Sequence, residues 1–255
     1  MIRIGPSGTG PDIEKGMWDM KRAGLDAVEL PFTYGVRMTN ERAKEIGQLN
    51  LGLGLALSIH APYYINLASE DPLKIEASKK RILDSCERGH HLGATHIVFH
   101  PAFYGKRTPE KTASLVSDAI AEMQLAIKRK KWDVLLAPET TGKKAQYGSV
   151  AELLAIVDEH GSSMTVDFAH LLARNGRINY GKVLDEVSSL KHVHAHFSGI
   201  EFGDRGEKKH LVTPKAEASK LLKEIRKRDV DITIINESPQ MMKDCLMMKH
   251  IVHSL

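Results

Sequence analysis

Residues 55–60 read LALSIH, a short apolar run that ends on a histidine, and residues 96–100 repeat this pattern as HIVFH. Between these runs, residues 72–92 carry apolar side chains at the spacing of an amphipathic helix. A strand, a helix and a second strand in this order predict two parallel strands joined by a right-handed crossover. The histidines that end the two runs are therefore expected at the same edge of a parallel sheet.

The same alternation of strand and helix continues in both directions along the chain. We expect strands at Ile2–Ile4, Ala27–Leu30, Leu55–Ile59, His96–Phe99, Val134–Ala137, Met164–Val166, His192–Ala195 and Ile232–Asn236. We expect helices near residues 12–24, 40–50, 72–92, 109–130, 149–160, 180–189, 214–228 and 239–253. Eight such units in 255 residues predict an α/β fold, a closed (β/α)8 TIM barrel, rather than an open doubly wound sheet. No Pro/Gly/Ser-rich linker interrupts them, so residues 1–255 are expected to form one domain.

Local motifs support the helix starts and argue against a dinucleotide-binding sheet. Asp71, Thr108 and Thr213 each precede a proline, which predicts a capping residue followed by proline at the first helical position. Residues 149–152 have the serine and glutamate spacing of a capping box. The glycines after the first predicted strand do not have the GxGxxG spacing of a nucleotide-binding turn.

Composition sets the broad class of protein. Apolar residues make up 42% and charged residues 27% of the chain, the balance of a globular protein with a sizeable core. The only two cysteines, Cys86 and Cys245, have no CxxC spacing, which argues against a disulfide framework or a thiolate zinc site. The N-terminus lacks the pattern of a signal peptide, and no apolar run has the length of a membrane span. We therefore expect a soluble, cytoplasmic protein without membrane contact.

Side chains that bind metals follow six consecutive predicted strands. They are His60, His100, Glu139, Asp167 with His170, His196 with His210 further along the same loop, and Glu237. In a β/α barrel these strand ends meet at one face, where the chemistry of such barrels is found. A lone histidine or carboxylate at a strand end is more often hydrogen-bonded or solvated than a ligand. Here, six consecutive strands each end on such a side chain at the same point of the strand–helix repeat. This coincidence predicts a centre of two or three divalent ions, because clustered buried carboxylates need cations to neutralise them.

The ligand types indicate which metal to expect and which nearby residues to leave out. Mixed imidazole and carboxylate ligands favour zinc, with manganese or iron as the next choices. His194 shares a strand and a face with His196, and we expect it to support a ligand or fill the barrel interior rather than bind metal. Glu29, at the end of the second strand, is a carboxylate to which the sequence assigns no partner.

These motifs resemble the endonuclease IV family of apurinic/apyrimidinic endonucleases, within the wider xylose-isomerase-like barrel superfamily. The resemblance covers roughly residues 58–240, and it is carried by His60-Ala-Pro-Tyr63 with Asn66, His100-Pro101, Glu139-Thr-Thr-Gly142, Asp167-Phe-Ala-His170, His196, His210 and Glu237-Ser-Pro239. It implies a three-zinc centre. His60, His100 and Glu139 would hold one ion, and Glu139 would bridge to a second ion completed by Asp167, His196 and Glu237. A third ion would involve His170 and His210.

The sequence departs from the family pattern around this third ion. The family has an aspartate two residues before its second loop histidine, and here that position is Lys208. It also has Asn-Asp after the histidine of the seventh strand, where this chain has Ser198-Gly199. Glu207, three residues before His210, is a carboxylate that would have to reach the site from a different position.

The resemblance implies a metal-dependent phosphodiesterase that cleaves double-stranded DNA 5′ of abasic sites in base excision repair. Two divalent ions roughly 3.5–4 Å apart can clamp a phosphodiester and lower the pKa of a bridging water toward about 7. We expect a hydroxide bridging the two ions to attack the phosphate, with Glu139 as the catalytic residue that orients it. The protein is expected to act as a monomer.

Two residues match DNA-contacting positions of the family. Tyr63 corresponds to its groove-inserting tyrosine, and Arg37 lies in the loop that carries its DNA-penetrating arginine. Other cations are expected in loops on the same face: Lys106, Arg107, Lys143, Lys144, Arg174, Arg177, Arg205, Lys208 and Lys209. Such a concentration suits a polyanionic substrate, whose binding weakens steeply with salt.

Two other functions remain open at this point. Sugar isomerases and epimerases of the superfamily use one metal held by a set that Glu139, Asp167, His196 and Glu237 also match. His60 and His100 favour phosphoester hydrolysis, because a one-metal site has no need of them. The other hypothesis is a non-catalytic metal-binding barrel, and it is favoured by the changes at Lys208 and Ser198-Gly199.

Overall fold

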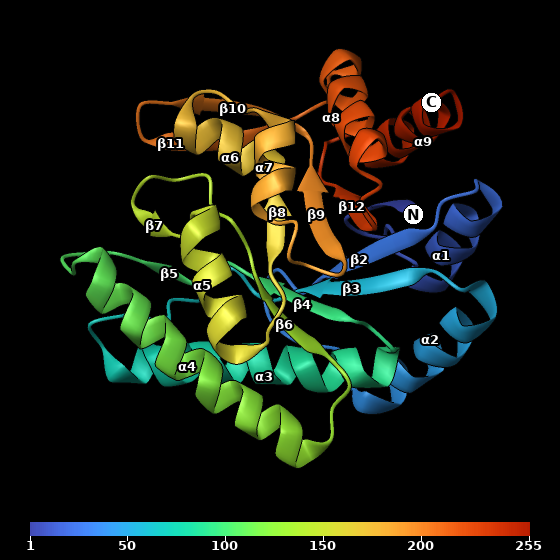
Figure 1. Cartoon of the computed structure of the whole chain (residues 1–255). Helices are drawn as coiled ribbons and strands as arrows, with labels where there is room; N and C mark the ends of the chain where they lie inside the picture. Colours follow the sequence, from blue (N-terminus) through green and yellow to red (C-terminus); the bar gives the residue numbers. More distant parts are fainter.

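The computed structural model describes residues 1–255 and has parallel strands at its centre with helices packed around them (Figure 1). The barrel strands are β1 (Ile2–Pro6), β2 (Ala27–Pro31), β3 (Ala56–His60), β4 (His96–Phe99), β6 (Leu135–Pro138), β8 (Thr165–Asp167), β9 (Val193–Phe197) and β12 (Ile232–Asn236). They form two four-stranded parallel arcs, β1-β12-β9-β8 and β2-β3-β4-β6. Single parallel bridges, Ser7 with Glu29 and Glu139 with Thr165, join the arcs at both seams. The chain is therefore a TIM barrel, as predicted.

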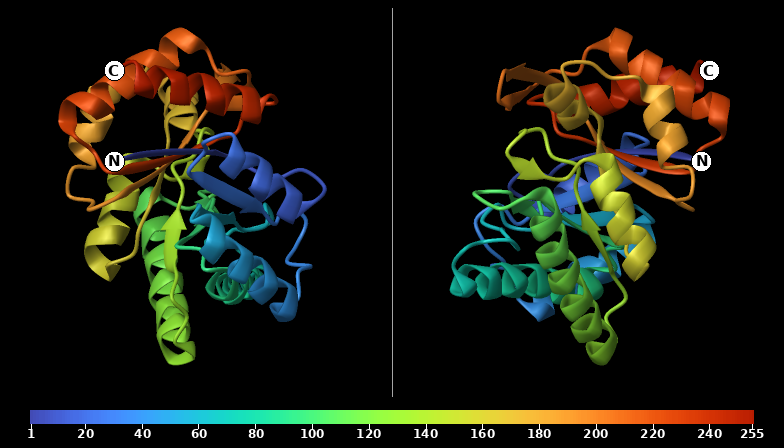
Figure 2. Two further views of the ribbon diagram at one scale, coloured as in Figure 1. Left: turned by 90° about the vertical axis from the view of Figure 1, so that its right-hand side faces the viewer. Right: turned by 60° about the vertical axis from the view of Figure 1, so that its left-hand side comes forward.

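The helices surround this barrel (Figure 2). They are α1 (Ile13–Arg22), α2 (Asn40–Leu53), α3 (Pro72–Leu92), α4 (Pro109–Lys130), α5 (Val150–His160), α6 (Phe168–Asn175), α7 (Tyr180–Glu186), α8 (Lys215–Arg228) and α9 (Met241–His253). Their buried faces pack on the strands in one continuous hydrophobic cluster. None of these helices is long and apolar enough to cross a membrane.

A glycine allows the first seam of the barrel to close. A Cβ at Gly5 on β1 would lie 1.8 Å from the carbonyl oxygen of Ala27 on β2. No side chain fits there, since the two backbones are already in contact. The seam then places the ends of β1 and β2 beside the other strand ends.

Most of the predicted helix starts are confirmed. The side chains of Asp71 and Thr108 accept hydrogen bonds from backbone N–H groups in the first turns of α3 and α4, each with a proline in that turn. Residues Ser149 and Glu152 form a complete capping box at the start of α5. The prediction for Thr213 is wrong: Pro214 occupies the cap position of α8. Thr213 instead accepts a hydrogen bond from Asn236 Nδ2, which holds its side chain toward the end of β12.

The structure contains elements that the sequence did not indicate. Helix α6 begins directly after β8, where the sequence predicts a loop. Strands β10 (Gly199–Gly203) and β11 (Gly206–Leu211) form an antiparallel hairpin between β9 and α8, and this hairpin packs on α6 (Figure 1). The short strands β5 (Ala102–Phe103) and β7 (Gln146–Tyr147) pair across two loops at the same face. These additions cover the barrel end that carries the predicted ligands.

Candidate metal centre

Five of the eight predicted ligands, His60, His100, His170, His210 and Glu237, line a cavity of about 490 Å³ at the C-terminal ends of the barrel strands. His60 ends β3, Asp167 ends β8 and His196 lies near the end of β9. His100, Glu139 and Glu237 each follow shortly after a strand. His170 lies in the first turn of α6, and His210 lies on β11. The parallel barrel thus brings all eight residues to one place, and their role as ligands stays a prediction.

Glu139 lies at the middle of this group and presents its two oxygens to different histidines. Its Oε2 is 3.2 Å from His60 Nε2 and 3.0 Å from His100 Nε2. Its Oε1 is 3.1 Å from His196 Nδ1 and 3.3 Å from His170 Nδ1. The Glu139 side chain is fully buried. A carboxylate in this position has one oxygen available to each of two neighbouring cations.

The hydrogen bond of His60 to the backbone leaves one of its ring nitrogens available. Nδ1 lies 2.8 Å from the carbonyl oxygen of Ala61, to which it donates in the neutral ring. Nε2 then carries the lone pair and faces Glu139. An imidazole held by a carbonyl through one nitrogen is the usual arrangement of a metal-binding histidine.

Buried polar atoms without partners mark the far side of the cavity. Asp167 Oδ1 accepts a 2.7 Å hydrogen bond from the backbone N–H of His170, which starts α6. Asp167 Oδ2 and His170 Nε2 are buried and have no hydrogen-bond partner. Unpartnered buried oxygen and nitrogen are costly, and a cation bound to them would remove this cost.

The ligand atoms form overlapping groups, each within 4.8 Å. One group is His60, His100 and Glu139, and a second is Glu139, Asp167, His196 and Glu237. A third is Asp167, His170 and His210. The first two groups share Glu139, and the division into two adjacent metal sites that the resemblance implies stays a prediction. The chemistry of these ligands, imidazole and carboxylate, fits zinc.

The pKa values in the centre show how strongly its charges depend on one another. Burial lowers the pKa of His60, but the hydrogen bond and charge of Glu139, together with the charges on Glu29 and Glu237, raise the pKa to about 9. Burial raises the pKa of Glu237, but the charge and hydrogen bond of His196, together with the charge on His210, lower the pKa to about 2. Glu139 is likewise held well below its usual pKa by His196 and His100, against the effect of burial. In the absence of metal, protonated imidazoles thus neutralise the buried carboxylates.

Sequence reasoning missed the role of Glu29. This carboxylate is fully buried inside the barrel and accepts a 2.8 Å hydrogen bond from Ser58. Its oxygens also lie 3.0 Å from His196 Nε2 and 3.1 Å from His194 Nε2. Glu29 therefore contacts the ring edge of His196 opposite Glu139, where it fixes which nitrogen faces the centre. The only sequence signal was a glutamate within an otherwise apolar strand. His194 lies in the barrel interior, as expected.

The two predicted DNA-contacting residues flank the centre. Tyr63 is 61% exposed, and its ring centroid is 5.7 Å from that of His60. Arg37 is exposed and lines a neighbouring cavity of about 630 Å³ with Tyr34. Pro31 and Thr33 line both cavities, so Arg37 lies beside the centre rather than in it.

Several cations expected to face a polyanion have structural contacts instead. Arg107 donates to the carbonyl oxygens of Ala68 and Ser69. Arg174, which lies in α6 rather than in a loop, donates to the carbonyl oxygens of Lys143 and Gln146. Exposed cations without an ion pair in this set are Arg37, Lys106, Lys143, Lys144, Arg177 and Arg205. The positively charged surface is smaller than the sequence indicates.

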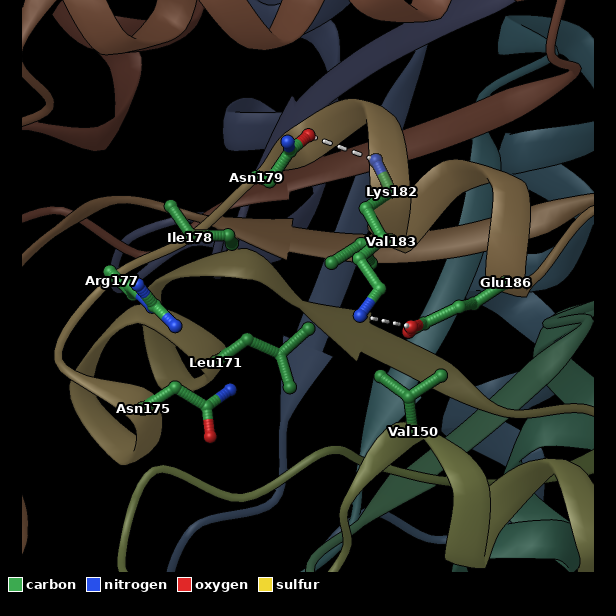
Figure 3. Close-up of a pocket in the computed structure, with 9 residues that line it drawn as sticks. All are labelled: Val150, Leu171, Asn175, Arg177, Ile178, Asn179, Lys182, Val183 and Glu186. Atoms are coloured by element: carbon green, nitrogen blue, oxygen red, sulfur yellow. Dashed lines mark hydrogen bonds and ion pairs between the residues drawn. The ribbon is translucent and has the colours of Figure 1, made fainter.

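A larger cavity of about 680 Å³ lies away from this centre, between α5, α6 and α7 (Figure 3). Its lining includes Leu171, Arg177 and an ion pair of 3.6 Å between Lys182 and Glu186. None of the predicted ligands lines it. The ligand cluster, rather than cavity size, identifies the candidate functional site.

Comparison with known proteins places the barrel in a family. The model of the xylose isomerase-like TIM barrel family matches residues 19–241. The chain belongs to this family. An uncharacterized protein of Methanocaldococcus jannaschii is 32% identical over 271 residues, which cover all of this chain and 98% of that protein. A probable endonuclease 4 of Mycoplasmoides gallisepticum is 38% identical over 114 residues, which cover 43% of this chain and 36% of that protein.

Solved structures share the fold over nearly the whole chain. Endonuclease IV from Thermus thermophilus has a TM-score of 0.74 and 19% identity, covering 99% of this chain and 97% of that one. A D-tagatose 3-epimerase-like protein has a TM-score of 0.76 and 18% identity, covering 99% and 96%. Identities this low establish the fold alone. The likeness therefore does not separate phosphodiester hydrolysis from sugar epimerisation.

Proposed function

We propose that this protein is a zinc-dependent phosphodiesterase that cleaves double-stranded DNA 5′ of abasic sites, as a step of base excision repair. The observation that carries this proposal is the two-sided contact of Glu139. One oxygen faces His60 and His100, and the other faces His196. A one-metal sugar isomerase would have no use for His60 and His100 in this position.

The residues present divide into two ligand sets that share Glu139. His60 and His100 would hold one ion, and Asp167, His196 and Glu237 would hold the other. Bound there, the ions would supply Lewis-acid stabilisation of charge on the phosphate and a water acidic enough to ionise near neutral pH. Glu139 orients the reacting groups between the two sets, and Glu29 fixes the ring of His196.

The surface around the cavity supports a nucleic-acid substrate. Tyr34, Tyr63 and Tyr64 are 77%, 61% and 67% exposed, although aromatic rings of this size are usually more buried. Exposed rings next to a cleft can stack on unpaired bases or enter a distorted duplex. Arg37 and Lys143 add positive charge where phosphates would lie. Manganese or iron would fit the same ligands as zinc.

The same proposal includes the setting in which the protein acts. We infer a cytoplasmic protein whose residues 1–255 act as one domain and as a monomer. Both cysteines are free and buried, which suits a reducing compartment.

An abasic duplex labelled at the 5′ end tests the proposal. Zinc- or manganese-loaded protein is expected to cut it 5′ of the abasic site, and His100→Ala is expected to lose most of this activity. His253→Ala is the matched control, because His253 is exposed at the end of α9 and belongs to none of the candidate ligand groups. Uncut abasic duplex, together with no effect of His100→Ala on any metal-dependent activity, would refute the proposal.

The competing function is a sugar epimerase. It is favoured by the close grouping of Glu139, Asp167, His196 and Glu237 and by a cavity of about 490 Å³, large enough for a monosaccharide. The salt dependence of substrate binding distinguishes the two functions. DNA binding is expected to weaken steeply between about 50 and 200 mM salt, by roughly ten-fold or more for each two phosphates neutralised, whereas binding of a neutral sugar is not.

A further inference from the structure

The hairpin of β10 and β11 carries the sequence change that separates this chain from the endonuclease IV pattern. At Lys208, where that pattern has an aspartate, the side chain points out to solvent. Its Nζ lies 3.5 Å from Glu201 Oε1, and Lys209 Nζ lies 3.3 Å from Glu201 Oε2. Both lysines are more than half exposed. Lys208 is thus held on the outer surface by Glu201 and contributes nothing to the cavity.

A β-bulge at Lys208 changes which face of β11 the neighbouring residues occupy. Glu201 pairs with Lys209 and Phe202 pairs with Glu207, so Lys208 is the extra residue of the hairpin. In a regular strand, residues 207 and 210 would point to opposite faces, because they are three apart. One extra residue between them reverses this alternation and brings Glu207 and His210 to the same face.

The bulge places Glu207 in the cavity against His170. Glu207 Oε2 lies 3.5 Å from His170 Nε2, and its side chain is only 15% exposed. A Cβ at Gly142 would lie 2.7 Å from Glu207 Cβ and 3.0 Å from His170 Cδ2. The backbone N–H of Glu207 also donates to the carbonyl oxygen of Gly142 over 3.1 Å. A glycine at 142 therefore makes the room in which Glu207 and His170 meet.

Both histidines of this corner have a ring nitrogen available for a ligand. His170 Nδ1 lies 3.0 Å from the carbonyl oxygen of Thr140, and Nε2 is buried without a hydrogen-bond partner. His210 Nδ1 lies 2.7 Å from Ser198 Oγ, which itself donates to the carbonyl oxygen of Gly199. Ser198 therefore accepts from His210 and leaves Nε2 of that ring for a ligand. The two rings are 5.3 Å apart between centroids.

We propose that Glu207 is a carboxylate ligand of a further divalent cation, bound in the corner formed by Asp167, His170 and His210. Glu207 supplies from an adjacent position the negative charge that Lys208 does not provide, and the bulge makes this exchange sterically feasible. This inference rests on the proposed metal centre but not on the identity of its substrate. His170 and Glu207 line the same cavity as His60 and Glu237, so the cation would face the same substrate.

Counting bound zinc tests the proposal without any activity assay. Equilibrium dialysis of the full chain at fixed free zinc, followed by elemental analysis, gives the number of ions per chain. We expect Glu207→Gln to bind one ion fewer than the wild-type chain. Lys208→Gln is the matched control, because it removes a charge from the next residue, which faces away from the cavity. It is expected to bind the wild-type number.

The outcomes separate this proposal from the proposed function. Equal counts for wild type and Glu207→Gln would overturn the proposal, and so would an equal loss in Lys208→Gln, which would mark a general effect of altering the hairpin. Circular dichroism checks the fold of each variant. If Glu207→Gln does not fold, Glu207→Asp replaces it, because this variant keeps the charge but has a shorter side chain. Glu207→Asp is expected to weaken binding of the last zinc ion by at least ten-fold, and unchanged binding would overturn the proposal. A chain that loses one ion in Glu207→Gln but never cleaves DNA would leave Glu207 a ligand and refute only the DNA substrate.

Discussion

The protonated histidines of the metal centre predict that zinc binding depends strongly on pH. Burial lowers the pKa of His60, but the carboxylates of Glu139, Glu29 and Glu237 together raise it to about 9. Zinc binds only the neutral ring, so each ion must displace this proton below that pH. At pH 7 the displacement costs on the order of 3 kcal/mol, at about 1.4 kcal/mol for each pH unit below the pKa.

This cost sets the size of the expected effect. For one histidine with a pKa of about 9, the apparent zinc affinity should rise about 100-fold between pH 6 and pH 8. A histidine at the ordinary value of about 6.5 would give a rise of only about 4-fold over the same range. His170 and His196 also have raised pKa values, caused by nearby carboxylates against the effect of burial, and they add to the effect.

Isothermal titration with zinc at pH 6, 7 and 8, in buffers of different ionisation enthalpy, measures both the affinity and the protons released. We expect at least one proton to be released for each zinc bound at pH 7. His253→Ala should behave as the wild type. A rise of about 4-fold or less with no proton release would refute the reasoning, because the histidines would then be neutral before zinc binds.

Four further predictions concern other parts of the structure. Without metal, the protonated His60 stabilises the fold fully below about pH 6.5, its unfolded pKa, and this contribution is lost as pH rises through about 9. The free energy of urea unfolding of zinc-free protein should therefore fall over this pH window, and a constant value would contradict the prediction. Glu29→Gln should fold but bind zinc about 10- to 100-fold more weakly, since His196 loses the carboxylate that orients its ring; unchanged affinity in a zinc titration would show that this contact is unimportant. Gly5→Ala should lower the free energy of unfolding by more than about 4 kcal/mol, because its Cβ would lie 1.8 Å from a backbone oxygen on β2; a loss below about 1 kcal/mol in urea would mean that the seam opens easily. Ser149→Ala should cost about 1 kcal/mol by removing the capping box of α5, and a thermal melt like that of the wild type would argue against it.

The barrel itself could be predicted because its signals are local. Each strand is a short apolar run, and each long helix has regular apolar spacing. The strands β4 and β12 have the bounds expected from the sequence, and the other six differ by one or two residues at one or both ends. Parallel topology then brings the strand ends together without any long-range information.

The sequence also contains the boundaries of helix α6, although Asp167 was interpreted only as a metal ligand. Asp167 caps the helix with Oδ1, and Gly176 ends it in the left-handed conformation. An aspartate before a helix-forming run and a glycine after it are ordinary helix boundaries. The single residue Asp167 therefore both starts the helix and faces the metal centre.

The finer geometry of the centre could not be read from the sequence. Glu29 contacts His194 and His196 from across the barrel, and no spacing in the chain indicates that pairing. The direction of Glu207 depends on one extra residue in the pairing of β10 and β11. A shift of one residue in register reverses every side chain of a strand, so such a detail requires the folded structure.

Anomalous diffraction from zinc-soaked crystals would show whether Glu139 joins two metal sites. Besides the further cation proposed at Glu207, we expect two strong zinc peaks roughly 3.5–4 Å apart, one on each side of the Glu139 carboxylate, with His60 and His100 bound to one of them. A single peak held by Glu139, Asp167, His196 and Glu237, with His60 and His100 bound to no metal, would contradict this arrangement and favour the one-metal sugar epimerase.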